Sequence, residues 1–434
     1  MRPSLPHHRF CLLLAAALCL TGMWIYASRV LIPYQISDAA AHGRPRGNLS
    51  DLYPRWLGAR ELLLHGRDPY SPEVTREAQI GFFGRPLDPD RPGGRNYQQG
   101  FYYPVYVVFF VAPTIRLPFE VVRKGFFWVL LGLTVVSIPL WLRVVGWPAP
   151  MWVQASLAIF TIGSLPVTQG LKLEQMTLLV AALVAVALAL LVADRPIAAG
   201  VALALATIKP QLVWLLLLWL LIWTLADWRR RYRWAASFLL TMAMLWAASE
   251  WYLPHWVSRF WQAIREYRSY TGEMSVMDEL MGAPWSRALE FLGFAVMIGA
   301  CWRDRRQAAK TNAFAGTLSL VLATTVLIVP TYGPYNQVLL MPALLIMLKE
   351  GGAIWQGSVA NRALSVFTAS LVVWPWIACI GLAGLSFLLR PELVERGWAI
   401  PFWTVLQTPM AVVALMLVHP YQRTFTTPSG PGSS

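Results

Sequence analysis

The sequence has little charge, little histidine and little cysteine. Only 13% of its 434 residues are charged, 57% are hydrophobic and the mean hydropathy is +0.50, whereas a water-soluble domain usually has about 25% charged residues. This composition excludes a water-soluble protein. The four cysteines, Cys11, Cys19, Cys301 and Cys379, lie in apolar runs without metal-ligand spacing. We therefore expect no disulfide framework, no metal site and no cofactor.

Acidic residues are the scarcer of the two signs of charge. The chain has 36 Lys and Arg against 22 Asp and Glu, which gives a net charge of +14. In a soluble protein this excess would suggest a polyanionic partner. In a membrane protein the basic loops on the cytoplasmic side supply it, so we expect membrane lipids as surroundings and no nucleic-acid partner.

Long apolar runs are what the sequence does have, and they predict an all-α integral membrane protein with about twelve transmembrane helices. The region 173–226 could hold two spans or three shorter ones. A cleaved signal peptide is the competing interpretation of the first run, but that run is longer than a signal-peptide core. The expected spans are 10–32, 103–115, 126–142, 151–167, 175–192, 197–226, 235–249, 288–301, 313–329, 338–348, 364–389 and 400–418.

Loop charge sets the expected orientation. With both termini in the cytoplasm, the alternation of spans places on the inside the basic residues Arg116, Arg123, Lys124, Arg229, Arg230, Arg231, Arg233, Arg303, Arg305, Arg306 and Lys310. Two long loops, at about 33–102 and 250–285, then lie outside. Residues 1–423 are expected to form one polytopic domain, and the Ser/Thr/Pro/Gly tail 424–434 to be disordered.

The first outer loop carries the signature of an interfacial helix. Ser50 can begin it, Gly66 can end it, and Leu52, Trp56, Ala59 and Leu63 recur at helical spacing. This pattern predicts an amphipathic helix lying on the outer leaflet. Asp51 falls in its first turn, where the helix dipole favours the carboxylate. Asp51 is then either a helix-start residue without chemistry or an anion available at the membrane surface.

The order of these motifs resembles glycosyltransferase family 87, the polyprenol-phosphate-mannose-dependent mannosyltransferases of the GT-C fold. The resemblance covers about residues 45–345. It departs from the family's pattern in two places: Glu174-Gln175-Met176-Thr177 stands for Gly-Gln and Asn, and the segment 330–337 has no His. The matching motifs are Asp51-Leu-Tyr53, Trp56, Ala59, 62–66 (Leu-Leu-Leu-His-Gly), Asp68-Pro-Tyr70, Tyr102-Tyr-Pro104 and Lys209-Pro210 after the Gly-rich run that starts at Gly200.

The resemblance implies a hexosyltransferase at the outer face of a bacterial-type plasma membrane. It would move a hexose, mannose in that family, from a polyprenyl-phosphate donor to a lipid or glycan acceptor with inversion. Asp51 is the implied base, and Asp38 and Asp68 are the rival carboxylates of the loop. The candidate substrate-binding residues are Tyr53, Arg55, Asp68, Tyr70, Tyr103, Gln175, Lys209, Tyr332, Tyr335 and Asn336.

Lys209 is the most informative residue within the apolar runs. A charge near a helix centre costs roughly 2.5 to 3.5 kcal/mol on insertion scales, so it normally has a partner or an aqueous cavity. Lys209 either contacts the donor phosphate or extends to an interface from a pair of shorter helices. Two other functions stay open: a lipid-linked sugar or polysaccharide transporter, and an inactive paralogue that only binds lipid-linked sugars.

Overall fold

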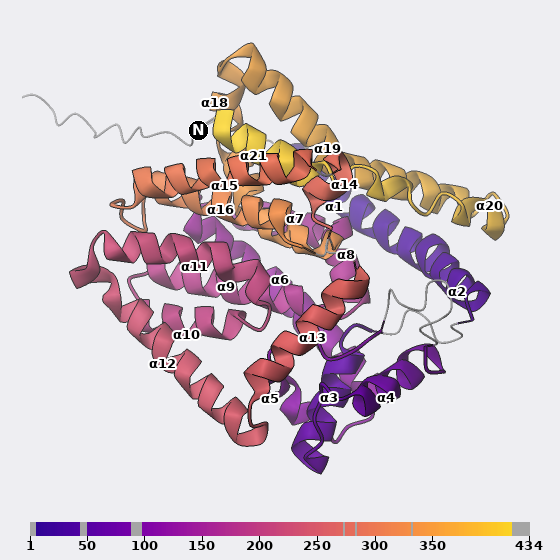
Figure 1. The fold of residues 1–434 in the computed structure, drawn as a ribbon. Coiled ribbons are helices and arrows are strands. Elements are labelled where there is room, and N and C mark those ends of the chain that lie inside the picture. The colour runs from indigo at the N-terminus through magenta and orange to yellow at the C-terminus, as the bar shows by residue number, and fades with distance from the viewer. Residues whose placement is uncertain are drawn as a thin grey trace, which may run out of the picture.

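The computed structural model describes residues 6–43, 50–87, 98–271, 274–282, 284–330 and 333–418. Within these ranges every regular element is helical, so the predicted all-α class is confirmed (Figure 1). The predicted tail 424–434 and the candidate residue Tyr332 lie outside the described residues.

The helices follow one another along the chain with short connections. Their bounds are α1 (Pro6–Tyr26), η1 (Ala27–Leu31), α2 (Ile32–Ala41), α3 (Tyr53–His65), α4 (Pro72–Phe83), η3 (Val105–Val107), α5 (Val108–Val111), η4 (Ala112–Thr114), α6 (Phe119–Val144), α7 (Met151–Ile162), α8 (Leu165–Lys172), α9 (Met176–Val192), α10 (Pro196–Ala206), α11 (Pro210–Leu225), α12 (Trp228–Tyr252), α13 (Trp256–Thr271), α14 (Val276–Met281), α15 (Trp285–Asp304), α16 (Asn312–Ile328), η5 (Pro334–Leu340), α17 (Met341–Lys349), α18 (Gly351–Gln356), α19 (Val359–Leu385), α20 (Pro391–Glu395), η6 (Ile400–Phe402) and α21 (Thr408–Val418).

In the described part of the chain, three helical stretches are long and apolar enough to cross a membrane. They are Arg9–Ala41, which joins α1 to α2, then α6 and α19. The pair α7 and α8, bent by 60°, could form a fourth span, and the other apolar helices have 10 to 17 residues. The first stretch runs past the predicted end at residue 32, because the π-helical turn η1 precedes Pro33 and lets the helix continue to Ala41.

The predicted span 103–115 does not cross to the other end of the bundle. Its ten helical residues are divided among η3, α5 and η4, which is too short for a hydrocarbon core of about 30 Å. Both of its ends lie beside the first loop: the Tyr70 hydroxyl donates to the Tyr103 carbonyl (2.7 Å), and the Trp56 indole donates to the Thr114 carbonyl (3.3 Å). Hydropathy identified an apolar segment here, and five of its ten helical residues are buried in protein: Val105, Tyr106, Val107, Val108 and Val111.

The region 173–226 holds three helices, α9, α10 and α11, which agrees with the second of the two alternatives in the number of helices. The chain breaks between α10 and α11 because Pro210 begins α11 and has no backbone N–H to continue α10. Lys209 precedes this proline, at a junction between helices and not at the centre of one span.

We call the end of the bundle that carries Asp51 the Asp51 end. Helix α6 begins there, since the Phe119 ring lies 4.9 Å from the Tyr53 ring and the Arg123 guanidinium lies 3.5 Å from a Glu174 carboxylate oxygen. The expectation that Arg123 and its neighbours Arg116 and Lys124 lie on the opposite side is therefore wrong. The expectation was wrong because segment 103–115 was counted as a span, which moved the residues after it to the other side of the membrane.

The opposite end of the bundle gathers basic loops. The Lys349 ammonium donates to the Val145 carbonyl there (3.0 Å). The Arg231 guanidinium donates to the carbonyls of Arg305 (2.7 Å) and Gln307 (3.0 Å), which joins the start of α12 to the loop after α15. Helices α6 and α12 therefore run in opposite directions between the two ends.

The first loop folds into a pair of helices, α3 and α4, beside the bundle (Figure 1). Helix α3 ends at Gly66, as predicted, with Gly66 at a φ of 65° that suits glycine. Its apolar side is buried in protein, because Leu52, Trp56 and Ala59 are at most 5% exposed. The expectation that this stripe lies in the outer leaflet is therefore wrong: it is a packing face against α4 and α5.

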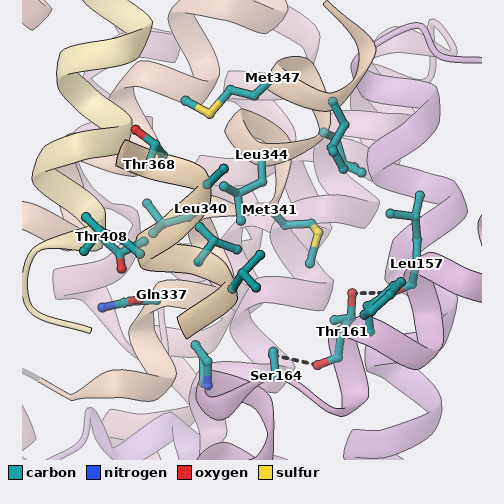
Figure 2. Close-up of a pocket in the computed structure, with 18 of the residues that line it drawn as sticks. Leu157, Thr161, Ser164, Gln337, Leu340, Met341, Leu344, Met347, Thr368 and Thr408 are labelled. Atoms are coloured by element: carbon teal, nitrogen blue, oxygen red, sulfur yellow. Dashed lines mark hydrogen bonds between the residues drawn. The ribbon is translucent and has the colours of Figure 1, made fainter. Parts of the chain in front are cut away.

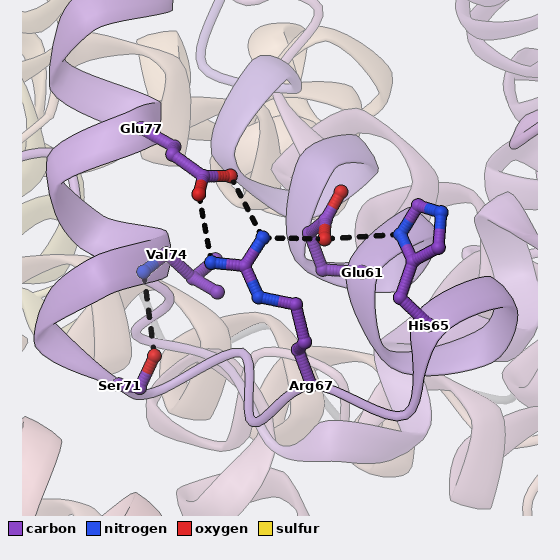
Figure 3. A network of polar contacts seen from close by, with 6 residues as sticks. All are labelled: Glu61, His65, Arg67, Ser71, Val74 and Glu77. Carbon is purple, nitrogen blue, oxygen red and sulfur yellow. Dashed lines mark hydrogen bonds and ion pairs between the residues drawn. The ribbon is translucent and has the colours of Figure 1, made fainter.

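The pair is held by an ion network around Arg67, seen in Figure 3. Arg67 donates to Glu61 of α3 (2.8 Å) and to Glu77 of α4 (2.7 Å), and His65 lies 3.0 Å from the same Glu61 oxygen. Glu61 is only 6% exposed, so it requires these partners. The network fixes the helix that follows Asp51.

Candidate functional site

Asp51, Gln175 and Lys209 form the centre of a polar cluster. The Gln175 side-chain amide donates through Nε2 to the Asp51 Oδ2 atom and accepts at Oε1 from the Lys209 ammonium (2.7 Å). Gln175 is 4% exposed and Lys209 6% exposed, while Asp51 is half-buried. Three residues that are far apart in the sequence thus form one hydrogen-bonded chain.

Asp51 is placed by backbone contacts and not by a helix cap. Its N–H donates to the Leu173 carbonyl (2.9 Å), and the Ser50 hydroxyl donates to the same carbonyl (3.2 Å). Ser50 also accepts from the Leu52 N–H (3.0 Å), so the turn before α3 is fixed to the loop between α8 and α9. The predicted role of Ser50 at the start of the helix becomes a role in fastening Asp51 to that loop.

Lys209 is held at the junction between α10 and α11. The Tyr106 hydroxyl lies 3.0 Å from both the carbonyl and the hydroxyl of Thr207, two residues before it. The Lys209 ammonium also donates to the Thr177 hydroxyl (2.8 Å), which lies 3.3 Å from the Asn336 side-chain oxygen. One of the three ammonium hydrogens remains, and no further acceptor among the described residues takes it.

A second cation lies beside Lys209. The Arg55 guanidinium donates to the Asp51 carbonyl (2.9 Å) and lies 4.4 Å from the centre of the Tyr103 ring, with the Lys209 ammonium 5.6 Å from the same ring. The Tyr335 ring lies 5.2 Å from Lys209. Aromatic faces suit cations that must keep their N–H groups available. The two cations, Arg55 and Lys209, outnumber the one carboxylate, Asp51. The net positive charge of these three groups favours the binding of an anion.

Tyrosines form the rim of this cluster toward α13. The Tyr102 and Tyr267 rings are in contact, with their centres 4.7 Å apart and their planes tilted by 45°. Burial raises the pKa of Tyr267 to about 12, and the nearby Asp51 carboxylate adds to the rise while Arg55 opposes it. Tyr267 is therefore a neutral hydrogen-bonding group at physiological pH.

Glu174 lies next to the cluster in an unusual backbone conformation. Its φ of 46° is in the left-handed region, where a residue with a side chain is uncommon, and it is 3% exposed. Its Oε2 atom has no partner among the described residues. Burial raises the pKa of Glu174 to about 7, against the opposing effects of Ser50 and Arg123.

The raised pKa of Glu174 predicts a dependence of stability on pH. The ionised carboxylate destabilises the fold, so the destabilisation is absent below about pH 4.5, grows between 4.5 and 7, and is complete above 7, at about 3 kcal/mol. We expect Glu174→Gln to unfold at a higher temperature than the parent at pH 8 and at nearly the same temperature at pH 5. Thermal unfolding in detergent measures this difference.

The control is Glu120→Gln, because Glu120 lies 3.9 Å from the same Arg123 and its side chain is 67% exposed. This variant should show no such growth in stability with pH. If Glu174→Gln is less stable than the parent at pH 8, the carboxylate of Glu174 stabilises the fold and its raised pKa is refuted.

Not all of the predicted site residues join the cluster. Tyr53 points toward α4, where a side chain at Gly81 would clash with its hydroxyl, and Asp68 accepts from the Tyr70 N–H (2.9 Å) and from Arg259 of α13. Tyr70 contacts the cluster only indirectly, because its hydroxyl donates to the backbone carbonyl of Tyr103. The structure does bring together Asp51, Arg55, Tyr103, Gln175, Lys209, Tyr335 and Asn336.

Several residues in or beside the cluster were not predicted as site residues: Thr177, Glu174, Arg123 and the rim residues Tyr102 and Tyr267. Thr177 carries no signal, because a threonine in an apolar helix usually bonds to its own backbone. Arg123 was expected on the other side of the membrane. Glu174 could have been suspected, since it replaces a glycine in the pattern that the segment resembles and adopts a backbone angle that suits glycine.

The described residues contain no group of three or more His, Cys, Asp or Glu side chains that could hold a metal ion.

A comparison with protein families shows a match between residues 101–330 and the model of glycosyltransferase family 87. The match includes Tyr103, Gln175 and Lys209; Asp51 and Arg55 precede it, and Tyr335 follows it. No curated protein and no solved structure matches the chain.

Proposed function

Because the chain belongs to glycosyltransferase family 87 and is thus a membrane glycosyltransferase, we propose that it transfers a hexose from a polyprenyl-phosphate donor. Mannose is the sugar that the resemblance implies, and the acceptor is a hydroxyl of a lipid or glycan. The observation that carries this proposal is the cluster itself, where one carboxylate lies beside two cations at a single end of the bundle.

In the proposed reaction Asp51 is the general base. As the acceptor hydroxyl attacks the anomeric carbon, its proton passes to the carboxylate, and the bond between that carbon and the phosphate oxygen breaks. The electron pair of this bond remains on the lipid phosphate. A single displacement inverts the anomeric carbon. The Asp51 Oδ1 atom accepts no hydrogen bond from the described residues, whereas Oδ2 accepts from Gln175, so Oδ1 is the atom assigned to the proton.

Arg55 and Lys209 are proposed to bind the donor phosphate. The phosphate gains negative charge as the bond to the sugar breaks, so fixed cations stabilise the transition state more than the bound donor. The buried Arg55 Nε atom has no partner among the described residues, and Lys209 retains one free donor. Both cations therefore have hydrogen-bonding capacity left for a phosphate.

A lipid-linked donor also needs room for its chain, and a cavity of about 590 Å³ supports this requirement (Figure 2). Its walls are mainly apolar, and the helices that contribute most of the lining residues are α7, α17 and α19. Gln337 is one of its few polar lining residues and follows Asn336, the residue that contacts Thr177 beside Lys209. We place the part of the polyprenyl chain nearest the phosphate in this cavity.

The proposed arrangement in the membrane has twelve segments, but they differ from the twelve expected from hydropathy. Segment 103–115 is no longer a span, and the expected span 197–226 is divided into two, α10 and α11. Helices α10 and α11 are about 16 and 24 Å long at 1.5 Å per residue, so Lys209 lies inside the bilayer thickness, below the outer surface. The twelve are α1–α2, α6, α7–α8, α9, α10, α11, α12, α15, α16, η5–α17, α19 and α21.

The positive-inside rule places the Asp51 end outside, because Arg231 and Arg305 belong to the opposite end. In this proposal the termini are cytoplasmic, and the membrane is the plasma membrane that the resemblance implies. We predict that a cysteine at Arg116, in a chain whose native cysteines are replaced, labels with an impermeant maleimide in intact spheroplasts. Glu73→Cys should label in the same way, and Arg233→Cys only after lysis.

Arg116 makes this test sharp because hydropathy alone places it inside, whereas the start of α6 beside Tyr53 places it outside. Labelling of Arg116→Cys only after lysis would refute the proposed arrangement of α6. The reverse pattern would refute the outward orientation of the site. In that pattern Arg233→Cys labels in intact spheroplasts, whereas Arg116→Cys and Glu73→Cys label only after lysis.

The transporter alternative is less well supported. A transport route needs ionisable groups along its length, whereas the buried charged residues among those described lie at the two ends or in the ion network of the first loop. They are Glu61, Glu174, Lys209, Arg231 and Asp304.

The proposed function is tested with purified protein, a radiolabelled polyprenyl-phosphate mannose and an extract of the cell-envelope lipids as acceptor. Transfer of label to a new product supports the proposal. Mass-spectrometric comparison of envelope glycans with and without the protein identifies the acceptor. Absence of transfer from mannose and glucose donors alike, with protein that is folded, would refute it.

A further inference from the structure

The orientation of the Gln175 amide is fixed by its two neighbours. A lysine ammonium can only donate hydrogen bonds, and an ionised carboxylate can only accept them. The amide oxygen must therefore face Lys209 and the amide nitrogen must face Asp51, as observed. Each polar atom of the Gln175 side chain already has a protein partner, which leaves this side chain little capacity for a substrate.

From this geometry we propose that Gln175 is a positioning residue for the transfer reaction, which aligns the Asp51 carboxylate and spaces it from the Lys209 ammonium. This inference rests on the proposed function only for its kinetic readout. It revises the expectation that Gln175 binds substrate. Without the amide, the carboxylate loses the hydrogen bond from Gln175 Nε2 and is no longer held in the position in which it accepts the proton.

The position of Gln175 in the chain suits such a role. Its backbone N–H donates to the Gly170 carbonyl (2.8 Å), and Leu173, two residues before it, accepts from the Asp51 N–H. The loop that carries the amide is thus bonded to the turn that carries the carboxylate. Thr177, two residues later, accepts from Lys209 and so holds the ammonium from a second direction.

Two substitutions separate the functions of the amide. Gln175→Leu removes both hydrogen bonds. Gln175→Glu keeps an acceptor for Lys209 but cannot donate to Asp51, and it adds a negative charge beside it. The matched control is Gln79→Leu, because Gln79 of α4 is also buried and its amide also donates (to the Gln98 carbonyl, 3.0 Å) and accepts (from the Leu87 N–H, 3.0 Å). Gln79 lies outside the cluster.

The first readout does not depend on transfer. Carbodiimide modifies protonated carboxyl groups, so mass spectrometry of Asp51 labelling across pH gives the pH of half-labelling. Loss of a hydrogen bond to a carboxylate favours its protonated form, so Gln175→Leu should raise this midpoint by about one unit, and Gln175→Glu by more. The surrounding charged and titratable groups stay constant in these variants: Arg55, Tyr103, Lys172, Glu174, Lys209, Tyr267 and Tyr335.

The second readout is kinetic. Misplacement of a catalytic group by about 1 Å lowers turnover by about 10²-fold, so we expect kcat per folded molecule to fall by that order in both Gln175 variants, with a smaller rise in the KM for the donor. The acid limb of the pH profile for Gln175→Glu should move to higher pH. Gln79→Leu should lower thermal stability and leave kcat per folded molecule and the labelling midpoint unchanged.

An unchanged midpoint of Asp51 labelling in both Gln175 variants would overturn the proposal, whether or not the protein transfers sugar. A rise in the KM for the donor at constant kcat would also overturn it and would make Gln175 a substrate contact. Failure of the proposed function is distinguishable, because it would appear as absence of transfer by the parent protein together with the expected shift in labelling.

Discussion

Asp51→Asn should lower sugar transfer by about 10²- to 10⁴-fold while the protein folds normally, because a general base contributes that much and an amide cannot accept the proton. The structure explains why folding should be unaffected. The Asp51 backbone N–H donates to the Leu173 carbonyl, and the amide oxygen of Asn can still accept from the Gln175 Nε2 atom. Turnover and thermal stability of the purified variant check both parts.

The matched control is Asp38→Asn, since Asp38 is a rival carboxylate of the same region but lies on α2, in an i,i+4 pair with His42 (3.5 Å). We expect this variant to retain transfer. Turnover by Asp51→Asn within a few fold of the parent would remove Asp51 from the mechanism. If the parent itself is inactive toward every donor, the inactive-paralogue alternative is favoured.

The class of the protein and the helix after Asp51 could be predicted from the sequence because both depend on local signals. Composition alone indicates membrane helices, and Gly66 ends α3 because only glycine adopts its backbone angle without strain. The arrangement of segments could not be predicted in the same way. Hydropathy measures how apolar a segment is and not whether it packs against lipid or protein, and the apolar segment 105–114 has half of its residues buried in protein.

The sequence alone does not determine the backbone structure at Pro210, the proline at the α10–α11 junction. A proline such as Pro210 indicates a break, but a kink in one helix and a turn between two helices share the same sequence signal. Contacts decide between them: the Tyr106 hydroxyl bonds to Thr207 in the break and fixes the turn. In the proposed arrangement, one misassigned segment before α6 and one here compensate, so that it also has twelve segments. The side of Arg123 relative to Asp51 was nevertheless predicted wrongly.

The candidate site was predicted in its residue types better than in its geometry. Asp51 and Lys209 were selected by their positions in the resembled motifs and by the rarity of charge in apolar runs. No sequence signal shows that the Gln175 amide lies between them, because the three residues are brought together by the packing of α3, α9 and α11. Tyr53 was selected as part of the motif Asp51-Leu-Tyr53, but the direction of its side chain on the helix turns it toward α4.

Lys209→Met should weaken transfer by about 10²- to 10³-fold, the usual effect of losing one fixed donor to developing charge. Its effect on stability should be small, because two contributions oppose each other. The substitution leaves the Gln175 and Thr177 oxygens without a donor, which destabilises, and removes an ammonium from a site that is 6% exposed, which stabilises. Thermal unfolding in detergent and the affinity for a polyprenyl-phosphate sugar measure the two effects separately.

Lys209→Arg keeps the charge but presents a planar fork in place of a compact ammonium, so it should restore only part of the transfer. The Tyr103 and Tyr335 rings, 5.6 and 5.2 Å from the ammonium, limit the space for a guanidinium. The matched control is Lys349→Met, which removes a half-buried lysine bonded to the Val145 carbonyl at the opposite end of the bundle and should leave donor affinity unchanged. A loss of stability in Lys209→Met with unchanged donor affinity per folded molecule would show that Lys209 is structural, and the phosphate would then have to be bound by Arg55 without it.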